Sequence, residues 1–315
     1  MTIRANRPAL VAHARESIAK GSKSFWFASK LFDPATRERA WLLYSWCRAC
    51  DDMMDGQDHG GALSTVDDPA ARLAQLQSLT TRALAGEATG NPAFDALGLV
   101  AAECAIPHAY PHDLVDGMAM DAAAFRPQTQ ADLMRYCYHV AGVVGLMMAC
   151  VMGVDPDDTD TMQRANDLGL AFQLNNIARD VMEDAQGGRC YLPADWLAEV
   201  SIIPRHCEQS EAIQPDVSEL LRSARKDEEG RKALATLTRR LAALSAPLEA
   251  SARIGAMRLP FRSRWAVLAA AGIYGDIGRE VARLGEAALD QRVSTSAAGK
   301  LLCVGKAWFQ ARRGI

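Results

Sequence analysis

LGLAFQLNNIARDVMEDAQGGRCYLP, residues 168–193, is the stretch from which the rest of the chain is best interpreted. It places Asn176, Asp180 and Asp184 four residues apart in a helix-compatible segment, with Gln173 about one turn earlier. Spacing of four residues stacks side chains on one face of an α-helix. Crowded carboxylates need a compensating charge or a metal. This face is therefore a candidate site for hard divalent cations.

A second row of the same kind lies upstream in YSWCRACDDMMD, residues 44–55, where Asp51, Asp52 and Asp55 recur at helical intervals. Two carboxylates ~4 Å apart repel by roughly 4 kcal/mol at an effective dielectric constant near 20. Mg²⁺ can compensate such a cluster, and it usually binds through one or two carboxylates plus substrate phosphates. Two facing acidic rows therefore predict a phosphorylated ligand between them.

Composition narrows the function classes. The net charge of −3 and a pI near 6.1 give no electrostatic footprint for nucleic acid, so no nucleic-acid partner is expected. The first ten residues lack the apolar run of a signal peptide, and the eight cysteines show no small-secreted-domain pattern. The apolar run Val140–Val154 is shorter than the ~18 to 20 residues that span a bilayer. A cytoplasmic protein and a buried helix at this run are expected.

No long alternating run predicts a strand, so the expected fold is all-α, with residues 1–315 forming one domain. Polar loops are expected at about 56–69 and 201–214, and GSKSF, residues 21–25, suits a loop or a helix start. Helices are expected over Arg4–Lys20, from Pro34 through the first acidic row, and over Ala70–Ala85, Pro92–Cys104, Asp113–Asp121, Asp132–Gly153, Asp216–Leu244, Pro247–Ile254, Leu259–Leu284 and Lys300–Arg312.

The small residues of YCYHVAGVVG, residues 136–145, have two compatible interpretations. Glycine weakens an isolated helix by up to ~1 kcal/mol relative to alanine, so Ala141, Gly142 and Gly145 are expected to make room. Either a neighbouring helix approaches closely, or the gaps form part of a tunnel wall for a long apolar substrate.

Other chemistries lack support in the sequence. Cys47 and Cys50 form a lone C-x-x-C, and His108 and His112 are expected in a loop because of Pro111, so neither pair has the partners that a zinc site needs. Dinucleotide-binding, P-loop and serine-hydrolase motifs are not found. An acidic helix face can simply be solvated. Both rows here are embedded among apolar residues, however, which favours a cavity.

Four motifs in order, GSKSF, YSWCRACDDMMD, YCYHVAGVVG and QLNNIARDVMEDAQGGRCYLP, resemble those of the squalene and phytoene synthases. The resemblance runs from Ser22 to about Arg292 and implies the all-helical isoprenoid synthase fold with a central cavity. It implies head-to-head condensation of two prenyl diphosphates. The resemblance is to the bacterial carotenoid branch, which implies that two geranylgeranyl diphosphates form phytoene through prephytoene diphosphate.

The resemblance also assigns roles, carried over position by position. It implies metal ligation by Asp51, Asp55, Asn176, Asp180 and Asp184, with asparagine where squalene synthases usually have aspartate. It implies catalytic roles for Tyr44, Arg48, Asp51, Asp52, Tyr136, Arg179, Asp180 and Tyr274. It implies substrate binding by Ser22, Ser24, Phe25, Arg48, Ala141, Val144, Gln173, Asn176, Arg179 and Tyr191.

The implied cofactor is Mg²⁺, with Mn²⁺ as a substitute, and no NADPH is expected. The alternatives are a dehydrosqualene or squalene synthase acting on farnesyl diphosphate, NADPH being needed only for squalene, and more remotely a non-catalytic helical scaffold. Because substrate and product are water-insoluble, peripheral contact with the inner membrane and transfer of phytoene to a downstream desaturase are further expectations.

Overall fold

The computed structural model describes residues 6–55, 68–200 and 217–313, and within those ranges every regular element is a helix. The prediction of an all-α fold is confirmed, whereas the predicted polar loops lie almost entirely outside the described residues. The elements are α1 (Arg7–Gly21), α2 (Lys23–Ser29), α3 (Pro34–Asp55), α4 (Pro69–Leu84), α5 (Pro92–Cys104), α6 (Ala109–Ala122), α7 (Gln130–Cys137), π-helix η2 (Tyr138–Gly142), α8 (Val143–Val151), α9 (Thr159–Gln186), α10 (Ala194–Glu199), α11 (Val217–Ala224), α12 (Glu228–Ala256), α13 (Phe261–Leu284), 3₁₀-helix η3 (Gly285–Leu289) and α14 (Ala297–Arg313).

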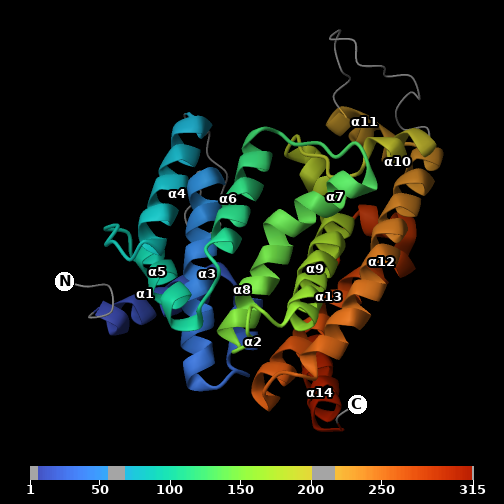
Figure 1. The fold of residues 1–315 in the computed structure, drawn as a ribbon. Helices are drawn as coiled ribbons and strands as arrows, with labels where there is room; N and C mark the ends of the chain where they lie inside the picture. The colour runs from blue at the N-terminus through green and yellow to red at the C-terminus, as the bar shows by residue number, and fades with distance from the viewer. Residues whose placement is uncertain (1–5, 56–67, 201–216, 314–315) are drawn as a thin grey trace.

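Helix α9 lies in the middle of the bundle (Figure 1), where it packs against α12, α13, α8 and η2. On one side, α1, α3, α5 and α8 surround a core that includes Leu42, Trp46 and Phe94. On the other side, α7, α11, α12 and α13 enclose a core around Leu174 and Trp196. The two acidic rows lie on α3 and α9, so they belong to opposite halves of the bundle.

Short polar signals set both ends of α9. The side chain of Asp158 accepts a hydrogen bond from the backbone nitrogen of Thr161 at 3.1 Å, which satisfies one of the free N–H groups of the first turn. At the other end Gly188 adopts φ +76°, a left-handed conformation that glycine tolerates best. Gly187 and Gly188 form the turn that ends the helix. Between these ends α9 runs for 28 residues as a rigid support for its acidic row.

The helix predicted over Asp132–Gly153 contains a π-helical turn at Tyr138–Gly142. Hydrophobic periodicity does not reveal a single wide turn, and such turns are frequent at functional sites. A Cβ atom at Gly145 would lie 2.3 Å from the carbonyl oxygen of Ala165, so α8 and α9 are in backbone contact. Ala141 and Gly145 also line an apolar cavity. The close approach of a neighbouring helix is therefore confirmed, and two of the small residues also line a cavity, while the long apolar substrate stays a prediction.

Replacing Gly169 with alanine is expected to lower the free energy of unfolding by about 1 to 3 kcal/mol. The new Cβ would lie 2.2 Å from the carbonyl oxygen of Ala141 and 2.8 Å from Cα of Gly142, and backbone atoms cannot rotate away. Denaturant unfolding of both proteins measures the change. Gly305→Ala is the matched control, because no heavy atom lies within 4 Å of that Cβ position. Equal stability of G169A and the unmodified protein would contradict the close approach.

In the C-terminal half of the chain, the helix boundaries in the structure differ from the predicted ones in two places. The helix predicted over Asp216–Leu244 is two helices, because Asp227 caps a new one through a 2.7 Å hydrogen bond from the backbone nitrogen of Gly230. The break predicted at Pro247 is absent: α12 continues through it. Pro247 is on the exposed face, and packing of α12 on α9 outweighs the local penalty of the proline.

The loop predicted around Pro111 is also wrong. Helix α6 begins at Ala109, and Pro111 lies in its first turn, where a backbone N–H would have no helical partner anyway. His112 is therefore helical, while His108 is the residue before the helix.

Within the described residues, the stretch Gln130–Val151 is long and apolar enough to cross a membrane by length and composition alone. It exceeds the predicted apolar run because α7 continues into η2 and α8. Half of its most apolar window is buried in the protein, and Leu133, Val143 and Met147 lie fully inside the two cores. This burial is typical of a core helix, as predicted for Val140–Val154.

Candidate active site

The acidic row of α9 and Asp51 of the α3 row face one polar cavity. Asp51 of α3 and Asn176, Asp180 and Asp184 of α9 all line a space of about 360 Å³. The rows are more than a hundred residues apart in sequence, and the packing of the two halves of the bundle brings them together. This juxtaposition creates a site with converging oxygen atoms on opposite walls.

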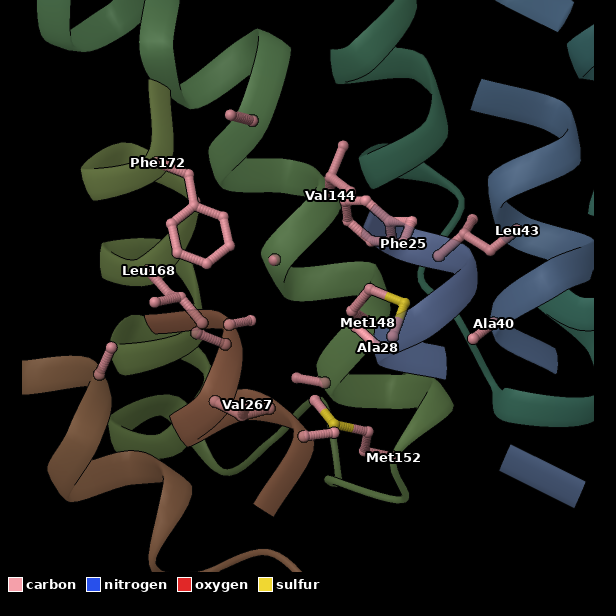
Figure 2. A pocket seen from close by; sticks show the side chains of 18 of the residues that line it. Phe25, Ala28, Ala40, Leu43, Val144, Met148, Met152, Leu168, Phe172 and Val267 are labelled. Atoms are coloured by element: carbon pink, nitrogen blue, oxygen red, sulfur yellow. The ribbon is translucent and has the colours of Figure 1, made fainter. Parts of the chain in front are cut away.

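An apolar cavity of about 440 Å³ adjoins the polar one, and Asp51, Gln173 and Asn176 line both. Figure 2 shows Phe172 near one side of it and Met152 toward the other, with further aliphatic side chains between them. A polar chamber that continues into an apolar one fits a ligand with an anionic head and a long hydrocarbon tail.

The acidic row of α9 is only partly compensated by the protein. The guanidinium of Arg179 donates to both carboxylate oxygens of Asp180, with Nε at 2.7 Å from Oδ1, and Nε of Arg292 lies 3.3 Å from the same oxygen. Burial, reinforced by the negative charge of Asp180, raises the pKa of Asp184 to about 7. The Oδ1 atom of Asn176 is buried with no hydrogen-bond partner.

On α3 the row is divided. Nε and Nη2 of Arg48 donate to Oδ1 of Asp52 at 2.9 and 2.6 Å, and neither residue lines the two cavities. Asp51 lies 3.9 Å from Nη1 of Arg48 and faces both cavities. The side chain of Asp55 lies outside the described residues. Asp52 is therefore held by Arg48 outside the two cavities, while Asp51 reaches the cavities itself.

Aromatic rings line the apolar cavity close to this junction. Phe172 stacks on Tyr274 with ring centroids 4.2 Å apart, and Phe25 lies 5.9 Å from Tyr44. Burial raises the pKa of Tyr44 to about 12 and also raises the pKa of Tyr274, so both phenols stay protonated. Aromatic faces attract positive charge. The wall can therefore stabilise a cation while excluding water.

Most of the residues predicted from the sequence are brought to these cavities. The apolar cavity is lined by Phe25, Tyr44, Asp51, Ala141, Val144, Gln173, Asn176 and Tyr274. The polar cavity is lined by Asp51, Tyr136, Gln173, Asn176, Arg179, Asp180, Asp184 and Tyr191.

The first motif is placed differently. Residues 23–29 form the short helix α2, and Oγ of Ser22 accepts a hydrogen bond from the backbone nitrogen of Phe25 at 3.2 Å. Ser22 is therefore an N-cap and does not line either of the two cavities. The side chain of Ser24 lies outside the described residues.

Two residues of the site were not expected from the sequence. Asp121, in the last turn of α6, lines the polar cavity and accepts hydrogen bonds from Tyr136 and Tyr191. Arg292, which follows η3, contacts Asp180 and lies 3.5 Å from Glu183. A single acid or a single arginine carries no spacing signal, and only the packing of distant helices reveals these contacts.

The oxygen atoms of this site fit a hard divalent cation. The buried, unpartnered Oδ1 of Asn176 and the partly buried carboxyl of Asp184 are ligands of the type that Mg²⁺ prefers. Among the residues described by the structure, no group of three or more His, Cys, Asp and Glu side chains is close enough to hold a metal unaided. Mg²⁺ commonly completes its shell with water and substrate phosphates.

Known proteins share this architecture. A helical bundle with acidic helices on two sides of a polar cavity, open to an apolar one, belongs to the isoprenoid synthase class. A solved dehydrosqualene synthase in complex with ligand superposes with a TM-score of 0.75 at 26% sequence identity, covering 97% of each chain. The fold class inferred from the residues is therefore also that of a known enzyme.

The squalene/phytoene synthase family matches residues 18–298, and the chain belongs to this family of prenyltransferases. The 15-cis-phytoene synthase of Pantoea ananas is 45% identical over 298 residues, covering 94% of this chain and 90% of the relative. That of a Paracoccus strain is 43% identical over 304 residues, covering 96% and 92%. The family recognised from four motifs is confirmed over nearly the whole chain.

Proposed function

We propose that the protein condenses two geranylgeranyl diphosphates head to head to phytoene, through prephytoene diphosphate, in carotenoid biosynthesis. The observation that carries the proposal is the polar cavity with two opposed acidic rows that continues into an aromatic-lined apolar cavity. Phytoene synthases with about 45% identity over most of the chain support the choice of this branch.

The polar cavity would bind the diphosphates. Asp51, Asn176, Asp180 and Asp184 would hold Mg²⁺, or Mn²⁺ in its place, and the bound ion would neutralise the diphosphate as a leaving group. Arg179 contributes a fixed positive charge in the same cavity. Preorganised charges of this kind stabilise the charge that develops as the carbon–oxygen bond breaks.

The apolar cavity would hold the hydrocarbon chains and the cation that remains. Phe172 and Tyr274 present stacked rings there, and exclusion of water protects the cation from capture. The second prenyl chain adds to this cation through its double bond and loses a proton, which forms prephytoene diphosphate. Departure of the second diphosphate, rearrangement of the resulting cation and loss of another proton then give phytoene. Tyrosine oxygens and the released diphosphate are the proton acceptors that the site offers. The pathway consumes no hydride, so NADPH is not required.

Incubation of the purified protein with Mg²⁺ and each prenyl diphosphate, without NADPH, tests the proposal. Phytoene from geranylgeranyl diphosphate is the expected product, and removing the metal with EDTA should abolish it until Mg²⁺ or Mn²⁺ is restored. Dehydrosqualene from farnesyl diphosphate, or squalene only when NADPH is added, would identify the corresponding alternative. If no prenyl diphosphate gives a product, the remaining alternative is a non-catalytic helical scaffold.

We also propose that the protein is cytoplasmic and contacts the inner membrane peripherally through one face. Residues 17–32, 250–275 and 291–313 together contain twelve Lys and Arg and no Asp or Glu, although the whole chain has a net charge of −3. Helix α13 begins in the second of these segments and contacts both α2 and α14, which lie in the other two. Arg253, Arg258 and Arg292 of these segments pair with acids elsewhere in the chain. The remaining basic residues still give the segments an excess of positive charge, which is complementary to anionic lipid headgroups.

Large exposed apolar side chains occupy the same helices. Among the described residues they are Phe25 and Phe27 of α2, Ile254 at the end of α12, Phe261 of α13, and Leu301, Leu302 and Phe309 of α14. Phe25 also lines the apolar cavity, so this face and the cavity share a wall. Release of phytoene here would deliver it into lipid, where a downstream desaturase can take it up.

Combined Leu302→Ser and Phe309→Ser substitutions are expected to lower binding to phosphatidylglycerol-containing vesicles about tenfold or more. They remove apolar surface, and each Å² of apolar surface buried in lipid contributes ~25 cal/mol to the binding free energy. Co-sedimentation measures the binding, and Arg135→Glu on α7, away from this face, is the control. Unchanged vesicle binding by the double variant would contradict the proposal that this face binds lipid. So would the finding that the unmodified protein is a dimer and that the two substitutions make it a monomer.

A further inference from the structure

Two tyrosines of the polar cavity share one carboxylate. The hydroxyl of Tyr136 donates to both oxygens of Asp121 at 3.1 Å, and the hydroxyl of Tyr191 donates to Oδ1 of Asp121 at 2.9 Å. We propose that Asp121 is a positioning residue that fixes the polarity of this tyrosine pair, so that both phenolic oxygens offer lone pairs, and not protons, to the cavity. The inference rests on the proposed function and deepens it.

The chemistry of the groups allows only one polarity. An ionised carboxylate only accepts hydrogen bonds, and each phenol has a single O–H to donate. Once both protons point at Asp121, the two tyrosines can act toward a ligand only as acceptors. Burial, together with the charge of Asp121, raises the pKa of both tyrosines, so neither loses its proton to water at neutral pH.

Packing of the two rings also fixes the direction in which their hydroxyl groups point. Tyr136 and Tyr191 stack with centroids 4.7 Å apart and an interplanar angle of 17°. They are 3% and 7% exposed, and Phe125 stacks on Tyr136 from another element at 5.9 Å. Side chains packed in this way cannot turn to exchange partners without displacing one another.

The consequence concerns the cationic stage of the proposed reaction. Asp121 and both tyrosines line the polar cavity, and Val140, one helical turn after Tyr136, lines both cavities where they join. A positive charge at that junction would face two oxygen lone pairs backed by a carboxylate. An outward-pointing O–H would instead present the positive end of its dipole. The orientation set by Asp121 is therefore favourable at the cation and nearly neutral for an uncharged hydrocarbon tail.

The same helix contains a matched pair outside the cavities. Tyr138 donates to Oδ2 of Asp113 at 2.7 Å, and neither residue lines the two cavities. Asp113 and Asp121 are both on α6, both are partly buried, and both accept from a tyrosine. A general effect of losing a tyrosine–aspartate hydrogen bond should be equal at the two positions.

Asp121→Asn keeps the shape but removes the negative charge behind the tyrosines, and an N–H donor group replaces one of the two oxygens that accept from Tyr136. We expect kcat to fall about 100-fold, with KM changed less than about threefold, since the tyrosines contact no diphosphate in this inference. The share of prephytoene diphosphate and of water-captured alcohols among the products should rise. Asp113→Asn should keep kcat within about twofold and leave the product ratio unchanged.

Tyrosine variants show whether Asp121 acts through its partners. In a Tyr136→Phe/Tyr191→Phe background, Asp121→Asn should lower kcat by less than about threefold further, because the groups it orients are gone. Normal kcat and product ratio in D121N, or equal losses in D121N and D113N, would overturn the inference. All variants are compared on whichever prenyl diphosphate the unmodified protein turns over. If the proposed function is wrong, the unmodified protein will not convert geranylgeranyl diphosphate to phytoene, and this outcome does not depend on the Asp121 variants.

Discussion

Alanine at Asp51 is expected to reduce turnover by roughly 10²- to 10³-fold, the usual loss when one preorganised charge-stabilising group is removed. Among the described side chains of the α3 row, Asp51 is the one that lines both cavities. Release of diphosphate and formation of hydrocarbon measure the loss. Circular dichroism and the unfolding midpoint should stay close to those of the unmodified protein, because the side chain is 43% exposed.

Asp180→Ala should reduce turnover to a similar degree, and it should also lower the free energy of unfolding. The side chain of Arg179 is only 15% exposed, and in this variant it would lose the carboxylate with which it forms an ion pair. An unpaired buried charge strongly destabilises a protein. Asp116→Ala is the control for both variants, because this exposed acid of α6 lies outside the two cavities. Full activity in D51A or D180A would contradict the metal assignment.

Phenylalanine at Val267 is expected to lower kcat/KM for geranylgeranyl diphosphate about 100-fold and for farnesyl diphosphate much less. Val267 lines the apolar cavity near Met152, away from Phe172 (Figure 2), so a larger ring there shortens the space for the tail. A misplacement of about 1 Å can already cost 10²-fold in rate. Competition between the two substrates in one reaction measures the ratio directly.

Ala298→Phe serves as the control for bulk, since Ala298 is exposed in the first turn of α14. It should leave both substrates unaffected. Equal losses for the long and the short substrate in V267F, without a fall in stability, would show that this end of the cavity does not determine chain length.

Local patterns predicted the parts of the site that a single helix determines. Spacing of four residues placed Asn176, Asp180 and Asp184 on one face because α9 is a regular helix with defined ends. The same logic placed the row of α3, although the structure shows Asp52 held by Arg48, while Asp51 reaches both cavities. Periodicity fixes the face of a helix, but not which member of a row finds a partner.

The rest depended on contacts between distant segments. Asp121 and Arg292 acquire meaning only when α6 and the segment after η3 fold against α7 and α9. The predicted boundary at Pro247 failed because an exposed proline was tolerated by a helix packed on α9. The predicted loop at Pro111 failed because the first helical turn needs no N–H partner. In each case tertiary packing outweighed the local signal.

The wide turn η2 determines how one run of sequence can wall two different chambers. Tyr136, Val140, Val144, Met148 and Met152 line the cavities at intervals of four, the first facing the polar space and the last three the apolar one. In a regular α-helix each such step rotates the side chain by about 40°, so the strip would wind away from the site within its length. The extra residue of the π-turn takes up part of this rotation. Single-residue deletions near 138–142 should therefore swing every downstream lining residue out of alignment, whereas substitutions there disturb only their own position.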